Sequence, residues 1–166
     1  MGGYDQIPVI MPAAAPAVRA STFHVPPERR LRRTLAGLGF REAVSLGFTA
    51  PGDAAAFGAS ASELVAIRNP LGEETRNLRF SLLPGLLAAA RRNQDALPSV
   101  TDLRFFELGR TFEWSPRTAD MPVETDRLAL LMRGRRRPPS WSDANDALDA
   151  HDLVGVLELL CALVDA

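Results

Sequence analysis

Apolar residues recur at the three-to-four-residue spacing of an α-helix in three stretches of the chain. The first stretch, residues 27–38, begins at a proline and is followed by Gly39, which favours a helix that stops there. The second stretch predicts a helix over residues 82–92, with Ser81 as the N-cap and Asn93 as the closing residue. Each helix is expected to bury one apolar face. These faces consist of Leu31, Leu35 and Leu38 in the first helix, and of Leu83, Leu86, Leu87 and Ala90 in the second.

The third stretch predicts a helix over residues 148–164. Asp149 and Asp152 fall in its first turn, where the helix dipole favours negative charge. The residues at helical spacing that we expect to be buried are Leu153, Val156, Leu157, Leu160 and Val164.

Strands are expected between these helices, where apolar residues alternate or run together. The candidates are residues 42–48, 63–67 and 103–114, the last of them interrupted at Gly109, together with a short helical turn after Pro51. Residues 128–132 are continuously apolar, which predicts a central strand covered on both faces. Antiparallel strands flanked by helices give an α+β domain.

Composition narrows the class of protein. A chain of 166 residues fits one domain, and 46% hydrophobic with 23% charged residues is typical of a soluble globular protein. All 19 basic residues are arginines, but the net charge of -1 gives no general attraction to nucleic acid or to a membrane surface. No apolar run reaches the length of a membrane span, and the single Cys161 allows no internal disulfide, so a cytoplasmic location is expected.

Four blocks of sequence occur in a distinctive order. They read Gly3-Tyr-Asp-Gln-Ile-Pro8, Asn69-Pro-Leu71, Arg79-Phe-Ser-Leu-Leu-Pro-Gly-Leu-Leu87 and Phe106-Glu-Leu-Gly-Arg-Thr-Phe112. In this order and spacing they closely resemble the β subunit of bacterial phenylalanyl-tRNA synthetase. A further block near the C-terminus, Asp149-Ala-His-Asp-Leu-Val-Gly155, extends the resemblance over essentially the whole chain.

The resemblance implies an architecture and a place in a larger assembly. It implies the core of a class II aminoacyl-tRNA synthetase, truncated at its C-terminus, over residues 23–166, preceded by a connector over residues 1–22 that is the tail of another module. Family β subunits are several times longer, so a fragment is expected. The resemblance also implies an (αβ)2 heterotetramer, in which the α subunit uses ATP and Mg²⁺ to attach phenylalanine to tRNA(Phe). The β core is then a structural support.

One position speaks against catalysis by this chain. In the catalytic α subunit of the family, a segment similar to residues 109–113 ends in an arginine that contacts the ATP phosphate and the amino-acid carboxylate. Here that position holds Glu113, whose charge would repel the same anions. We therefore expect no catalytic residue, no cofactor and no metal site in this chain, and no activity from it alone. His24 and His151 show no metal-ligand spacing.

The resemblance also suggests where the α subunit binds. The helix over residues 27–38 and the strand after it match the order of the dimerisation motif of class II synthetases. The candidate interface residues are therefore Leu31, Leu35 and Leu38, with Leu83, Leu86 and Leu87 as alternatives that could equally belong to the internal core. Packing of both helices within their own domain is the competing interpretation.

Two further functions stay open at this stage. The first is an RNA-binding module that uses the basic residues Arg133, Arg135, Arg136 and Arg137, although a run of this kind without interleaved aromatic residues is more often a solvated loop. The second is an autonomous enzyme of the same fold, which Glu113 disfavours.

Overall fold

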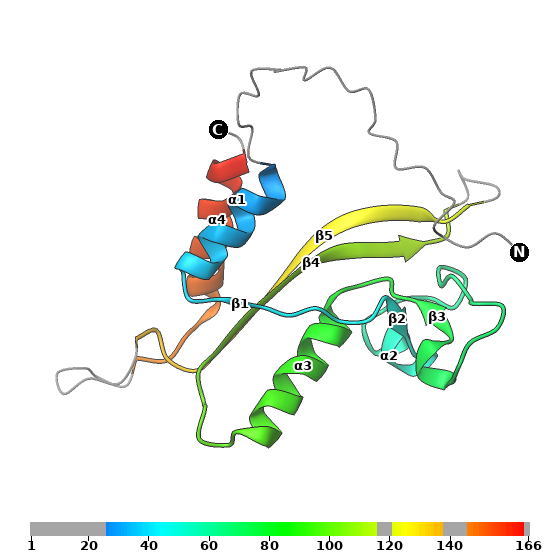
Figure 1. Cartoon of the computed structure of the whole chain (residues 1–166), viewed down its shortest axis with the longest axis horizontal. Helices are drawn as coiled ribbons and strands as arrows, with labels where there is room; N and C mark the ends of the chain where they lie inside the picture. The colour runs from blue at the N-terminus through cyan, green and yellow to red at the C-terminus, as the bar shows by residue number, and fades with distance from the viewer. Residues whose placement is uncertain (1–25, 116–120, 138–145, 165–166) are drawn as a thin grey trace, which may run out of the picture.

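The computed structural model describes residues 26–115, 121–137 and 146–164. Its centre is a three-stranded sheet in the order β1–β4–β5 (Figure 1). β4 (Leu103–Glu113) and β5 (Val123–Arg133) pair antiparallel along their whole length, with Leu108 opposite Leu128. β1 (Arg41–Glu42) pairs with β4 in parallel. The sheet is therefore mixed, and the expectation of purely antiparallel strands is wrong for β1.

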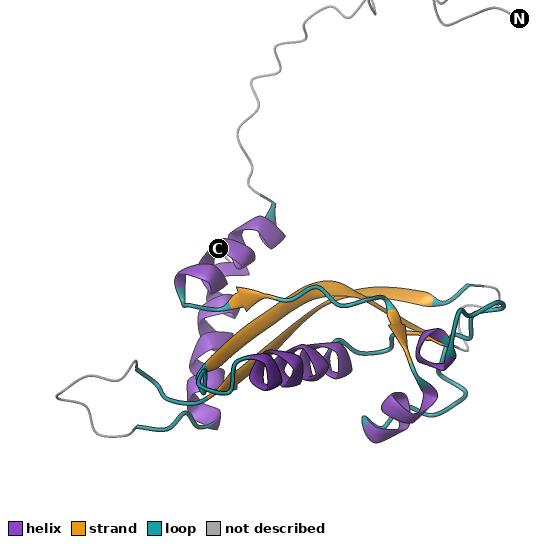
Figure 2. Cartoon of the chain, turned by 60° about the horizontal axis from the view of Figure 1, so that its bottom comes forward, coloured by secondary structure: helices purple, strands orange, loops and turns teal. Residues whose placement is uncertain are grey.

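Helices cover both faces of this sheet (Figures 1 and 2). α1 (Pro27–Gly37) and α4 (Ala150–Val164) lie against one face, and α3 (Leu83–Ala96) lies against the other. Alternate residues of β4 and β5 point to opposite faces, so each face has its own core. The core under α1 and α4 contains Leu35, Phe40, Phe106 and Leu160. The core under α3 contains Leu82, Leu86, Ala90, Leu103, Phe105 and Ala129. The α+β class, with a sheet flanked by helices, is confirmed.

A smaller unit lies beside the start of α3 (Figure 1). β2 (Phe48–Thr49) and β3 (Asn77–Leu78) form a two-stranded antiparallel sheet. α2 (Pro51–Ala56) follows β2, and the 3-10 helix η2 (Glu73–Thr75) precedes β3. The helical turn predicted after Pro51 is confirmed.

The helix predictions are correct in place and differ at the ends. α1 matches the prediction to within one residue. α3 continues past Asn93 to Ala96, and the Asn93 side-chain amide donates a hydrogen bond to the Ala89 carbonyl at 2.9 Å inside the helix instead of closing it. Its N-cap is Leu82 rather than Ser81, whose hydroxyl accepts instead from the Leu83 N–H at 3.2 Å.

α4 begins at Ala150, and its burial is narrower than its apolar pattern suggests. Leu160 is buried, and Leu153 and Val156 are half-buried. Leu157 and Val164, which were expected to be buried, are exposed. The reason is that α1 and the sheet contact only one side of α4.

The strand predictions need more correction. Residues 42–48 form no single strand, because the chain leaves β4 after Glu42 and enters the small sheet at Phe48. The strand predicted over residues 63–67 is reduced to one bridge, Ala66 with Asn77. β4 passes through Gly109 without a break. Residues 128–132 belong to β5, which is covered on both faces as expected but lies at the edge of the described sheet, with β4 in the middle. The predicted connector over residues 1–22 lies outside the described residues.

None of the described helices combines the length and the apolar character needed to cross a membrane.

Candidate partner-docking site

A charged side chain is enclosed where β4 passes the start of α3. Glu107 on β4 is 2% exposed, and Nη1 of Arg79 lies 2.6 Å from its Oε1. The Ser45 main-chain N–H donates to the same oxygen at 3.1 Å, and the Ser45 hydroxyl lies 2.9 and 2.8 Å from the two carboxylate oxygens. A buried charge pair is tolerated when its remaining polar atoms are also satisfied, as they are here. We call Arg79, Glu107 and Ser45 the Glu107 network.

Two glycines leave room for this network. A Cβ on Gly109 would collide with the guanidinium of Arg79, and a Cβ on Gly85 would collide with the side chain of Ser45. With Gly109 in place, Arg79 also donates from Nε to the Arg110 carbonyl at 2.8 Å. Gly109 therefore serves a close approach inside a continuous strand rather than a strand break.

The Glu107 network determines which side chains face outward on the neighbouring segment. Ser45 turns toward Glu107, and the adjacent residues of an extended segment point the opposite way. Val44 is 89% exposed and Leu46 is 75% exposed, while Phe48, further along, is 42% exposed. We call Val44, Leu46 and Phe48 the 44–48 edge. Contiguous exposed apolar side chains of this kind are typical of a protein–protein contact.

A cavity of about 340 Å³ adjoins the 44–48 edge. Its other walls come from the start of α2, from η2 and from the first half of α3, including Gly85 and Ala88. Asp53, Glu74 and Arg92 place charged groups on its wall. The surface is thus an apolar ridge beside a hollow with a polar rim, which is the anatomy of a protein interface.

A structured loop exposes another apolar side chain close to η2. Leu71 is 99% exposed. The turn after it is fixed, because the Gly72 N–H donates to the Thr75 hydroxyl at 3.0 Å and that hydroxyl donates to the Gly72 carbonyl at 3.0 Å. A large apolar side chain held fully in solvent by a hydrogen-bonded turn is a candidate anchor for a partner.

At the other end of the sheet, one arginine fastens the start of α4. Arg136 forms ion pairs with Asp146, Asp149 and Asp152 at 2.9, 2.9 and 2.8 Å. These carboxylates raise the pKa of Arg136, with the hydrogen bond to Asp152 the largest cause. The main-chain N–H of Asp149, followed by Arg136, lowers the pKa of Asp152. We call these four residues the Arg136 clamp.

Comparison with known proteins gives the family. The family described as "Phenylalanyl tRNA synthetase beta chain CLM domain" matches residues 7–166. The chain belongs to this family. It is 40% identical over its full length to the phenylalanine–tRNA ligase beta subunit of Geobacter sulfurreducens, and 38% identical over 96% of its length to that of Syntrophus aciditrophicus. It spans 20% of the length of each of these relatives.

Solved structures give the fold alone. Two structures of the pyrrolysyl-tRNA synthetase from Desulfitobacterium hafniense match with TM-scores of 0.57 and 0.56 at 18% and 19% identity. Each match covers 83% of this chain, and 42% or 44% of the synthetase chain. The β-chain domain therefore shares the fold of an aminoacyl-tRNA synthetase.

The sequence blocks that carry the family resemblance contribute residues to the internal contacts of this β-chain domain. Arg79 and Gly85 come from one block, and Glu107 and Gly109 come from another. They meet in the Glu107 network and in the space around it. Asp149 and Asp152 of the C-terminal block belong to the Arg136 clamp, and Leu71 ends the Asn-Pro-Leu block.

The leucines predicted for the subunit interface are divided by the fold. Leu35 and Leu86 have no exposed surface and lie in the two internal cores, while Leu31 and Leu38 pack partly buried against the core under α1. Leu83 and Leu87 keep 43% and 46% of their surface exposed. Their role at a subunit interface stays a prediction. Sequence reasoning missed Val44 and Leu46, because their alternation with the polar Ser45 predicts a strand that buries its apolar residues.

Glu113 lies exposed at the end of β4. Across the hairpin, Glu124 and Asp126 form ion pairs with Arg110 at 3.0 and 3.3 Å, while Glu113 is opposite Val123 and so leaves the other face of the strand pair. The described residues also hold no group of three side chains suited to a metal ion, and His151 is an exposed residue beside Asp149.

The four arginines of the candidate RNA site are brought together but are largely engaged within the domain. Arg136 is held by the clamp, Arg135 lies 3.7 Å from Asp102, and Arg133 donates to the side chain of Gln94. Only Arg137 lacks a described partner and is exposed. Since aspartates pair with two of the four arginines and Gln94 accepts from a third, the geometry gives the RNA-binding hypothesis no added support.

Proposed function

We propose that this chain is the structural core of a phenylalanine–tRNA ligase β subunit and binds the catalytic α subunit along the 44–48 edge. The observation that carries the proposal is the exposure of Val44 and Leu46 on a segment that the Glu107 network holds in place. Because Ser45 is fastened, the two apolar side chains are presented on a main chain that loses little conformational entropy on binding. Leu71, on the loop before η2, extends the proposed contact.

In this proposal the chain supplies no catalytic group. The holoenzyme is an (αβ)2 heterotetramer in the cytoplasm with a class II core, and its α subunit attaches phenylalanine to tRNA(Phe) with ATP and Mg²⁺. The exposed carboxylate of Glu113 would repel a nucleotide phosphate, which supports the assignment of nucleotide chemistry to the other subunit. The β core then contributes by positioning the α subunit.

The test is assembly of a full-length β subunit containing this chain with its matching α subunit. We expect Leu46→Asp to abolish co-purification and aminoacylation, because a carboxylate placed in a desolvated apolar contact is strongly unfavourable. Leu97→Asp is the matched control, because Leu97 is also exposed, at 55%, but lies at the far end of α3.

The two variants can be compared only if both are as fully folded and as stable as the unmodified subunit. Circular dichroism spectra and thermal midpoints of both variants should match those of the unmodified subunit, since both side chains lie on the surface. Normal assembly of the Leu46→Asp subunit would overturn the proposed docking edge. Equal loss of assembly in both variants would mean that the substitution acts through solubility rather than through the interface.

A further inference from the structure

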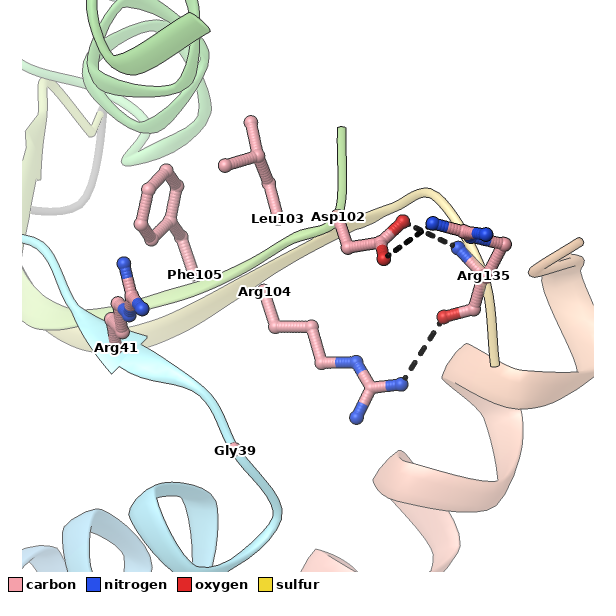
Figure 3. A pocket seen from close by; sticks show the side chains of 7 residues that line it. All are labelled: Gly39, Arg41, Asp102, Leu103, Arg104, Phe105 and Arg135. Atoms are coloured by element: carbon pink, nitrogen blue, oxygen red, sulfur yellow. Dashed lines mark hydrogen bonds and ion pairs between the residues drawn. The ribbon is translucent and has the colours of Figure 1, made fainter. Parts of the chain in front are cut away.

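A second cavity, of about 190 Å³, lies where β1 begins (Figure 3). Its wall carries three arginines and one carboxylate among seven residues. The residues are Gly39, Arg41, Asp102, Leu103, Arg104, Phe105 and Arg135. Three positive charges against one negative charge leave an excess of two positive charges around a small space.

The internal contacts of these arginines leave most of this charge uncompensated. Arg135 contacts Asp102 in two ways. The Arg135 main-chain N–H donates to Oδ1 of Asp102 at 3.0 Å, and Nη2 of Arg135 lies 3.7 Å from Oδ2. Arg104 donates only to main-chain carbonyls, including that of Arg136 at 2.7 Å. The Arg41 guanidinium has no hydrogen bond or ion pair with any described residue, since Arg41 pairs with β4 only through its main chain. Carbonyl acceptors orient a guanidinium but do not neutralise it, so the cavity attracts an anion.

The cavity opens at an uncovered edge of the sheet. β1 pairs only with Phe105 and Phe106, whereas Leu103 and Arg104 pair with β5 alone. Arg41 leaves the sheet on the same side as its partner Phe105, and Arg104 leaves it on the other side (Figure 3). A ligand at this edge can therefore approach positive charge on both faces of the sheet.

We propose that this cavity receives the carboxylate of an acidic side chain from the protein that docks along the 44–48 edge. The inference rests on the proposed function, because that docking brings the partner past β1. Arg41 lies three positions before Val44 on the same stretch of chain, so the cavity and the apolar ridge are close together at this edge of the domain. An ion pair at the rim would fix the orientation of the partner, while Val44 and Leu46 supply apolar contact.

Two observations favour a protein carboxylate over an RNA phosphate. The cavity is smaller than the several hundred cubic ångströms usual for ligand pockets, and it suits a single side-chain carboxylate better than a nucleotide. Asp102 lies on its wall, and the three aspartates of the Arg136 clamp lie at the same end of the sheet, where they would repel a polyanionic backbone.

The experiment measures the dissociation constant of α and full-length β subunits at low and high salt. We expect Arg41→Glu to weaken binding about 10-fold or more at low salt and less at high salt, because salt screens the interaction. Arg41→Lys should retain most of the affinity. Arg91→Glu is the matched control, because Arg91 is 86% exposed on α3 and contacts only Asp95, at 3.9 Å.

Leu46→Asp, measured in parallel, separates this inference from the proposed function. If Leu46→Asp weakens binding and Arg41→Glu behaves like Arg91→Glu, the carboxylate site is wrong and the docking edge stands. If Leu46→Asp leaves binding intact, both fail. If Arg41→Glu leaves subunit affinity unchanged but weakens tRNA binding by the holoenzyme, the anion is a phosphate and the protein-carboxylate assignment is overturned.

Discussion

Replacement of Glu107 by alanine removes the negative partner of Arg79 from the interior. Glu107 is 2% exposed and the Arg79 side chain is 11% exposed, so water cannot easily take the place of the lost carboxylate. Ser45 loses the acceptor of its hydroxyl and of its main-chain N–H in the same step. The variant therefore contains a buried cation and unsatisfied polar groups at once.

The expected cost is large compared with the stability of an ordinary domain. Breaking a buried charge pair by removing one partner typically costs about 3–5 kcal/mol, against a total free energy of unfolding of about 5–15 kcal/mol. Replacing both partners with apolar residues of similar volume is often close to neutral. We therefore expect Glu107→Ala to lose about 3–5 kcal/mol and Arg79→Met with Glu107→Leu to recover most of that loss.

Urea unfolding followed by far-ultraviolet circular dichroism measures both effects, provided that the m-values agree. Arg110→Ala serves as the control, because its ion pairs with Glu124 and Asp126 are exposed and its unfolding midpoint should stay near that of the unmodified chain. A loss below about 1 kcal/mol for Glu107→Ala, the range of an exposed pair, would refute the view that this network holds the fold together.

Gly109→Ala should destabilise the chain, since the new Cβ collides with the Arg79 guanidinium, and the same urea experiment measures the loss. The lowered pKa of Asp152 predicts that its contribution to stability is complete above the ordinary aspartate pKa of about 3.9 and declines as the pH falls through the lower pKa of the folded state. The protection factors of the amides in the first turn of α4, which correct for the pH dependence of intrinsic exchange, should therefore fall at low pH. Asp152→Asn should lower these protection factors already at neutral pH, with less further change on acidification. Leu71→Ser should leave the unfolding midpoint unchanged and weaken assembly with the α subunit, as measured by co-purification; unchanged assembly would remove Leu71 from the interface.

Sequence reasoning succeeded where local signals decide the structure. Prolines at the first turns and leucines at helical spacing placed α1 and α3 within a few residues. It failed where a distant partner decides. Residues 42–48 alternate like one strand, yet Ser45 is fastened to Glu107, 62 positions away, and the segment leaves the sheet. The sequence around Ser45 contains no pattern that predicts a contact with Glu107.

The candidate site divides in the same way. The family blocks were recognisable in the sequence, but the contact between Arg79 and Glu107, 28 positions apart, was visible only in the fold. Arg136 illustrates the opposite error. It looked like part of a solvated basic loop, because the carboxylates that hold it come from later in the chain, at Asp146, Asp149 and Asp152.

The inward turn of Ser45 separates stability from recognition within three consecutive residues. Ser45 contributes to the folding free energy through Glu107, whereas Val44 and Leu46 bury little surface in the described domain. Substitutions at the two outer positions can therefore retune the choice of partner at little thermodynamic cost, while a change at the middle position would misplace both outer side chains together. The enclosed carboxylate thus sets the geometry of a surface that it never touches.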